Sequence, residues 1–205
     1  MFRKSEYHEY TCLSCFESMS IGMYFLDWWV KKDGLCHQCR SQMMPKWIQY
    51  EKQGIKIESV YPYDGLGRDL LLNFKDSHDR WLKDVFLNPI FLKFHLKFWG
   101  YTIVVAPGSK RPYQPNVKLL NDIYLPVVDD VFEKIRPYKQ SERKGYERHG
   151  VYDVIALKNI ASIQHKKVLL FDDLCTSGHT LRACYELIVK EVSQIKVFTL
   201  FYHEL

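Results

Sequence analysis

The sequence lacks a long uninterrupted hydrophobic run. Its longest apolar stretch, residues 86–106, is broken by Pro89, Lys93, His95 and Lys97. Charged side chains at that spacing would lie in the middle of a bilayer and oppose insertion. Residues 1–30 mix acidic and basic side chains and hold no apolar run of signal-peptide length. We therefore expect no membrane span and a cytoplasmic protein.

Internal repeats, low-complexity tracts and a strong excess of one charge are also absent. The 205 residues include 29 Lys and Arg against 24 Asp and Glu, a formal net charge of +5. This mild basic excess is compatible with a polyanionic partner but does not by itself indicate one. A hydrophobic content of 47% and an aromatic content of 15% disfavour disorder. The length fits one α/β core with a small appended module.

Three regions of the chain differ in amino-acid composition and hydrophobic pattern. Residues 1–50 hold four of the six cysteines, and residues 51–60 are polar enough for a connection or an edge strand. Beyond them, helical and strand-like patterns alternate, which is typical of an α/β domain. We expect a module over 1–50 and a larger domain over 60–205. The expected helices cover 67–74, 80–86, 89–99, 116–125, 127–135 and 180–190, and the expected strands cover 102–106, 168–171 and 195–201.

Four cysteines form two Cys-x-x-Cys pairs, Cys12 with Cys15 and Cys36 with Cys39, and 20 residues separate the pairs. In a reducing compartment this pattern indicates a metal site instead of disulfides. Two such knuckles supply the four thiolates of a tetrahedral structural zinc site. We predict a zinc ribbon without a catalytic role. Redox chemistry is the alternative, but neither knuckle follows a strand and opens a helix as redox motifs do.

A phosphate-binding turn is predicted where a buried strand meets a helix. The strand 168–171 is followed by two carboxylates, a small hydroxyl-rich turn and a helix. Backbone N–H groups at a helix start can bind an anion, and a glycine allows close backbone approach. Carboxylates at the end of a strand suit sugar hydroxyls or a hydrated Mg²⁺ ion. An ordinary capped helix is the alternative. The candidate ligand-binding residues are Asp172, Asp173, Thr176, Ser177, Gly178, His179 and Thr180.

The run 168–181 resembles the phosphoribosyl-pyrophosphate loop of type I phosphoribosyltransferases. That resemblance implies an open parallel sheet with helices on both faces, ribose contacts from Asp172 and Asp173, and a 5′-phosphate held by Thr176–Thr180. The four-cysteine ribbon and the segment 63–75 (YDGLGRDLLLNFK) extend the resemblance. Together they resemble the ComF/ComFC family of competence proteins. The implied ligands are Zn²⁺, Mg²⁺ and phosphoribosyl pyrophosphate.

The resemblance has a clear departure after the first parallel strand. The family reads Pro-Val-Pro there, whereas this chain reads Val105-Ala106-Pro107-Gly108. Because active transferases handle pyrophosphate with this loop, we rank three hypotheses. The first is a ComFC-like factor that binds single-stranded DNA during natural transformation and docks a ComFA-like ATPase. The second is an active phosphoribosyltransferase, and the third is an interaction module in which the phosphate turn has no function.

A basic segment supports the first hypothesis. Residues 134–148 contain six basic residues against two acidic ones, with Tyr138 and Tyr146 between them. Basic and aromatic side chains together suit single-stranded nucleic acid, since cations follow the phosphates and rings stack on bases. A solvated charged loop is the alternative. The candidate nucleic-acid-binding residues are Lys139, Arg143, Lys144 and Arg148.

Overall fold

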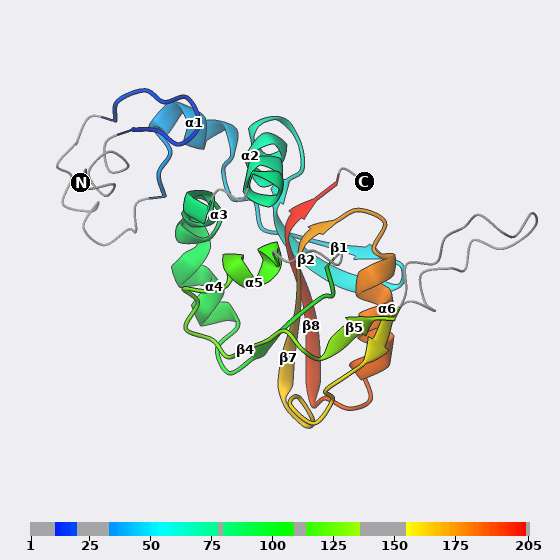
Figure 1. The fold of residues 1–205 in the computed structure, drawn as a ribbon. Coiled ribbons are helices and arrows are strands. Elements are labelled where there is room, and N and C mark those ends of the chain that lie inside the picture. The colour runs from blue at the N-terminus through cyan, green and yellow to red at the C-terminus, as the bar shows by residue number, and fades with distance from the viewer. Residues whose placement is uncertain (1–10, 20–32, 78–79, 109–113, 136–154, 204–205) are drawn as a thin grey trace, which may run out of the picture.

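A computed structural model describes residues 11–19, 33–77, 80–108, 114–135 and 155–203. Groups of helices and groups of strands follow one another along the chain (Figure 1). The helices are α1 (His37–Gln42), α2 (Gly65–Asp76), α3 (Lys83–Leu87), α4 (Phe91–Lys97), α5 (Pro115–Leu119) and α6 (His179–Ile188), with 3₁₀ turns η2 (Arg80–Leu82) and η3 (Asn88–Ile90). The strands are β1 (Ile48–Lys52), β2 (Ile55–Pro62), β3 (Thr102–Val105), β4 (Val127–Val128), β5 (Phe132–Lys134), β6 (Ile155–Leu157), β7 (Lys167–Cys175) and β8 (Gln194–Tyr202).

The described residues build one six-stranded sheet in the order β1-β2-β8-β7-β3-β4 and a small two-stranded sheet of β5 and β6. In the large sheet only β1 is antiparallel to its neighbour, so all the other strands end at the same edge. Strands β7 and β8 pair over almost their whole length, from Lys167 opposite Gln194 to Cys175 opposite Tyr202. The expected α/β class with a mostly parallel open sheet is confirmed.

Two hydrophobic clusters cover the two faces of this sheet. The first cluster packs α2, α3, α4 and α5 against one face, and its centre is aromatic. Phe198 contacts Phe94 and Phe98 edge-on, with ring centroids 5.1 and 5.5 Å apart. The second cluster packs α6 and the small sheet against the other face. Figure 1 shows α6 on the opposite side of the sheet from α3, α4 and α5. Helices on both faces were expected and are present.

The cysteine-containing module packs directly on the first cluster. Cys12, Leu35 and Cys39 are buried members of that cluster. The side chain of Arg40 binds the carbonyl of Val85 in α3 at 2.8 Å. The module and the sheet domain therefore share one hydrophobic core in the described part of the chain.

The secondary structure departs from expectation in three places. Residues 127–135 were expected as a helix and are instead β4 and β5, because Val127 and Val128 pair with Ile103 and Val104 of β3. The helix expected over 116–125 stops after α5. The polar segment 51–60 was expected as a connection or an edge strand. It belongs to the β1–β2 hairpin, in which β1 is an edge strand and β2 lies inside the sheet. Pairing with a neighbouring strand outweighs local helical spacing.

No helix among the described residues combines the length and the apolar character needed to span a bilayer.

Candidate functional site

The four cysteines of the two knuckles converge on one point. The Sγ atoms of Cys12, Cys15, Cys36 and Cys39 all lie within 4.8 Å of one another. Cys12 and Cys39 are buried, whereas Cys15 is exposed. The other two cysteines, at 175 and 184, are buried elsewhere in the sheet domain. Four thiols at this separation can hold a metal ion such as zinc.

Short backbone contacts position these thiols. The N–H group of Cys36 points at Cys12 Sγ at 3.3 Å, and the N–H group of Cys39 points at Cys36 Sγ at 3.5 Å. Leu13 donates its N–H to the carbonyl of Gly34, which joins the two knuckles. A Cβ at Gly34 would lie 2.5 Å from Leu13 Cδ1, and its φ is +80°. Glycine is therefore required where the second knuckle passes the first.

Electrostatics within the cluster favour a bound cation. Burial opposes ionisation of Cys12, but N–H groups of Cys15, Cys36 and Ser14 lower its pKa to about 7. Burial, together with the neighbouring thiols, raises the pKa of Cys39 to about 12. Four thiolates in this volume would repel one another without a cation between them. His37 is exposed and is not one of the converging groups.

A second candidate site lies where the connections after two neighbouring strands run to opposite faces of the sheet. The chain leaves β3 toward α5 on one face and leaves β7 toward α6 on the opposite face. Strands β3 and β7 are neighbours, with Val104 opposite Leu170. Open α/β sheets bind ligands at the carboxyl ends of neighbouring strands whose connections diverge in this way, which is called a switch point.

The turn Thr176–Thr180 forms one wall of this switch point. Gly178 has φ +78° and caps α6, and no side chain caps the helix start. The N–H groups of Ser177 and Gly178 donate to no residue that the structure describes. The hydroxyls of Thr176, Ser177 and Thr180 also have no hydrogen-bond partner in that part of the chain. The turn thus presents free donors at the positive end of the α6 dipole, where an anion is favoured.

The acidic pair belongs to the strand and does not follow it. Strand β7 continues to Cys175, because β8 offers a partner as far as Tyr202. Asp173 is 5% exposed and forms an ion pair with Lys75 of α2, 2.7 Å from Nζ to Oδ1. Asp172 Oδ1 accepts hydrogen bonds from Asn116 Nδ2 and from the Asp173 N–H, both at 2.9 Å.

Both carboxyl groups resist ionisation. Burial, followed by the charge of Asp173, raises the pKa of Asp172 to about 7, although Asn116 and Lys75 oppose the rise. Burial also raises the pKa of Asp173, against the effect of Lys75. Since Lys75 already neutralises Asp173, Asp172 is the carboxyl group of the pair that is left for a ligand.

Lys75 and Asn116 are site residues that the sequence did not single out. Asn116 is 6% exposed, and its Oδ1 has no hydrogen-bond partner among the described residues. A buried acceptor without a partner beside Asp172 fits a hydroxyl group or a metal-bound water molecule. The donor set of this corner therefore fits a hydrated Mg²⁺ ion or a ribose hydroxyl. Asn116 could not be found by motif, because 56 residues separate it from Asp172.

The predicted nucleic-acid-binding residues Lys139, Arg143, Lys144 and Arg148 lie outside the described residues, as do Tyr138 and Tyr146. Of the basic segment, the structure describes Lys134 at the end of β5 and Ile135 after it.

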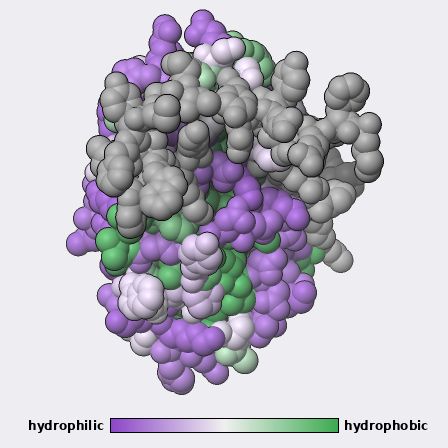
Figure 2. Space-filling model, turned by 90° about the vertical axis from the view of Figure 1, so that its left-hand side faces the viewer, coloured by the Kyte–Doolittle hydropathy of each residue, from purple (hydrophilic) through white to green (hydrophobic). Residues whose placement is uncertain are grey.

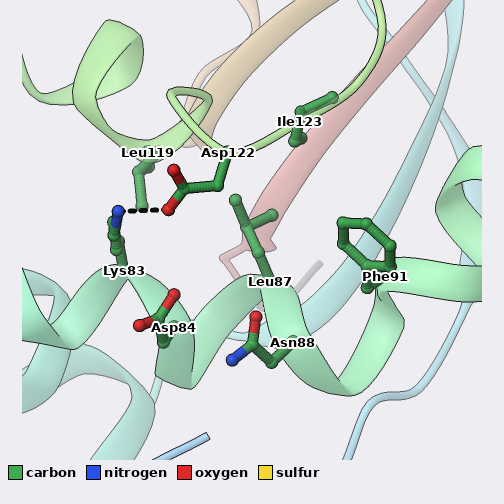
Figure 3. Close-up of a pocket in the computed structure, with 8 residues that line it drawn as sticks. All are labelled: Lys83, Asp84, Leu87, Asn88, Phe91, Leu119, Asp122 and Ile123. Carbon is green, nitrogen blue, oxygen red and sulfur yellow. Dashed lines mark hydrogen bonds and ion pairs between the residues drawn. The ribbon is translucent and has the colours of Figure 1, made fainter. Parts of the chain in front are cut away.

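A small hollow, open to solvent, lies between α3 and the segment after α5. Figure 3 shows Lys83 and Asp122 joined across its rim, with Leu87 and Leu119 in its wall. Because an ion pair spans the opening and the residues lining it carry no free catalytic set, this hollow gains no functional assignment.

An exposed apolar row runs along helix α4 and the turn after it. Leu92 and Leu96 of α4 and Trp99, two residues beyond its end, are 70%, 71% and 79% exposed. Figure 2 turns this side of the molecule toward the viewer and shows hydrophobic side chains between hydrophilic ones in its lower half. Exposed apolar patches are a common feature of protein-binding surfaces.

Comparison with known proteins yields likeness at the level of structure. No protein-family model matches the chain, and no curated protein sequence matches it. Among solved structures, it is similar to APRTase from Giardia lamblia complexed with 9-deazaadenine, with 17% identity, a TM-score of 0.41, and coverage of 82% of this chain and 97% of that chain. It is also similar to adenine phosphoribosyltransferase from Saccharomyces cerevisiae, with 13% identity, a TM-score of 0.37, and coverage of 76% and 83%. The fold class itself follows from the strand order and the two helical layers.

Proposed function

We propose that the chain is a ComFC-like competence factor that handles single-stranded DNA in the cytoplasm on a phosphoribosyltransferase-type scaffold. The observation that carries this proposal is the turn Thr176–Thr180 at the β3–β7 switch point. Its backbone and hydroxyl donors are free, and it opens α6. A phosphate group is the ligand that such a turn recognises.

In this proposal the turn binds a backbone phosphate. Asp172 with Asn116 would hold a hydrated Mg²⁺ ion beside it, because the deoxyribose inside a DNA strand has no free hydroxyl group. The polar corner around Asp172 lies at the end of the same strand that leads into the turn. The basic residues 139–148 would follow neighbouring phosphates, and their effect would fall with salt as counterions are released. A ComFA-like ATPase is the proposed partner.

Zinc has a structural role in the proposal. The four thiols hold the ion in a closed set, with no position left for a substrate. Because Cys12 and Cys39 are part of the first hydrophobic cluster, the bound ion would also stabilise the packing of the module on α3.

An active phosphoribosyltransferase is the second candidate, and the intact acidic corner favours it. Asp172 and Asn116, beside Asp173 that is paired with Lys75, form a set that fits the ribose hydroxyls and hydrated Mg²⁺ of phosphoribosyl pyrophosphate. Bound Mg²⁺ would neutralise the pyrophosphate charge. This chain would position the sugar through Asp172 and hold the 5′-phosphate on the turn.

One paired experiment separates these functions. The protein is incubated with labelled phosphoribosyl pyrophosphate, Mg²⁺ and a panel of bases, and its affinity for single-stranded oligonucleotides is measured in parallel. Oligonucleotide binding without release of pyrophosphate supports the competence role. Pyrophosphate release with a base supports the transferase instead. Binding of neither ligand would contradict both functions and leave an interaction module.

A further inference from the structure

The β1–β2 hairpin lies against the turn Thr176–Thr180. A Cβ placed on Gly178 would lie 3.3 Å from Lys52 Cγ and 3.4 Å from Gln53 Cγ. The amide of Gln53 donates to the carbonyl of Ser177 at 3.3 Å. Figure 1 shows the end of β1 and β2 beside the start of α6. The hairpin is thus a second wall of the site, although more than 120 residues separate it from the turn.

Arg182 of α6 binds the tip of the hairpin. Its guanidinium donates to the carbonyls of Gln53 at 3.2 Å and Gly54 at 3.5 Å, and Glu186 holds it through an ion pair one helical turn away. Gln53 and Gly54 have φ values of +53° and +69°, which is the conformation of a tight hairpin turn. The tip of the hairpin is therefore fixed in position relative to the turn.

Lys52 is the cation on this wall. Along β1, Ile48, Tyr50 and Lys52 share the half-buried side of the strand, since side chains alternate. Tyr50 on that side packs against the cluster that contains Leu181 of α6. Lys52 therefore lies on the α6 side of the sheet. Its ammonium group forms no hydrogen bond or ion pair with any residue in the described ranges.

The surroundings of Lys52 indicate where its charge acts. Burial raises the pKa of the thiol of Cys175, the last residue before the turn. Tyr50 and the charge of Lys52 lower this pKa, and the charge of Asp172 adds to the rise. Glu51, next to Lys52, lies on the exposed side of β1 opposite Lys56. Arg182 is already neutralised by Glu186. The turn itself carries no acidic residue, so nothing within it neutralises Lys52.

We infer that Lys52 is a phosphate-binding residue that completes the turn Thr176–Thr180 from the hairpin side. The inference rests on the proposed function. The ligand is a phosphate oxyanion, which the N–H groups of the turn hold by hydrogen bonds and the Lys52 ammonium holds by charge. The phosphate of a free sugar phosphate and that of a polynucleotide share this chemistry, and the experiment tests each.

The competing explanation gives Lys52 a packing role only. Its aliphatic stem would cover Gly178 while its ammonium group remains in water, as lysine side chains often do. The variant Lys52→Met separates the two explanations, because methionine keeps an unbranched stem against Gly178 and removes the charge. Lys56→Met is the matched control, since Lys56 is an exposed lysine on the neighbouring strand of the same hairpin.

Binding is measured by calorimetry with two probes, Mg²⁺-phosphoribosyl pyrophosphate and an oligo-dT single strand. We expect Lys52→Met to lower the affinity for whichever probe the parent binds. The loss should be about 10- to 100-fold, the usual effect of one charge-assisted contact. Lys56→Met should stay within about twofold. The melting temperature and zinc content of both variants should equal those of the parent, and Lys52→Arg should recover most of the affinity.

The outcomes are distinguishable. If the parent binds neither probe, the proposed function fails and the inference fails with it. If the parent binds a probe and Lys52→Met binds it equally well, the proposed function stands and the inference is wrong. Equal losses in Lys52→Met and Lys56→Met would also overturn it, since a general loss of positive charge would then explain the result. Should Lys52→Met be unstable, Lys52→Gln gives the same comparison.

Discussion

Replacing Gly178 by alanine perturbs the phosphate turn through its backbone. The residue has φ +78°, a left-handed conformation that costs a residue with a Cβ about 1–2 kcal/mol. The new methyl group would lie 3.3 Å from Lys52 Cγ and 3.4 Å from Gln53 Cγ. Both neighbours are flexible side chains and can move by a few tenths of an ångström. We therefore expect a loss of about 1–2 kcal/mol of unfolding free energy, which lowers the melting temperature by about 2–8 °C.

The effect on binding should be larger than the effect on stability. Any relief of the backbone strain rotates the N–H groups of Ser177 and Gly178 away from the ligand. Loss of one charge-assisted hydrogen bond weakens binding by about 10- to 100-fold. Gly178→Val should abolish binding, because a β-branched residue fits this conformation even less well.

Gly100→Ala is the matched control. Gly100 has nearly the same φ, +77°, but a Cβ there would meet nothing within 4 Å. It lies between α4 and β3, at the opposite end of β3 from the site. Thermal or urea unfolding should show similar losses for the two variants, whereas calorimetry with Mg²⁺-phosphoribosyl pyrophosphate and oligo-dT should show weaker binding for Gly178→Ala alone. Unchanged affinity in Gly178→Ala would refute the assignment of the turn.

Three further predictions concern zinc, pH and DNA. Elemental analysis should find one zinc per chain. The variant Cys36→Ser should lose the zinc, and its cysteine module should no longer pack on the sheet domain. A parent protein that is folded without zinc would contradict this. Because its pKa is raised to about 7, Asp172 binds more protons in the folded state than in the unfolded state between about pH 4 and 7. The unfolding free energy of the ligand-free protein should therefore fall as pH rises through this range, and Asp172→Asn should reduce the slope; an equal slope in both proteins would argue against it. Replacing Arg143, Lys144 and Arg148 by Glu should weaken the binding of single-stranded DNA. The slope of log affinity against log salt concentration should become shallower by about 0.7 per lost contact. Affinity equal to that of the parent at every salt concentration would contradict this prediction.

Local chemistry made part of the molecule predictable. The cysteine pairs stand out because two thiols three residues apart have few uses in a reducing compartment. The strand–turn–helix around Gly178 could be read because each of its parts is encoded within fourteen neighbouring residues, from 168 to 181. Its one error was the end of β7, which depends on the length of β8.

The remaining features depend on contacts between distant segments. Strand β4 is two residues long and forms only because β3 lies beside it. Asn116 and Lys75 reach the acidic pair from two different helices, and no pattern within either helix indicates this. The hairpin could have been predicted from the sequence. Apolar and polar residues alternate over 48–52 and 55–59, on either side of a turn that ends in Gly54.

Amide NMR of the labelled 205-residue chain shows directly whether the turn Thr176–Thr180 binds phosphate. Titration with Mg²⁺-phosphoribosyl pyrophosphate, and separately with oligo-dT, should shift the amide signals of Ser177, Gly178 and His179 saturably with at least one of the two. The same signals in Gly100→Ala should respond as in the parent. If these three amides stay in place with both ligands while shifts appear elsewhere, the phosphate site is not at this turn and the proposed function is wrong.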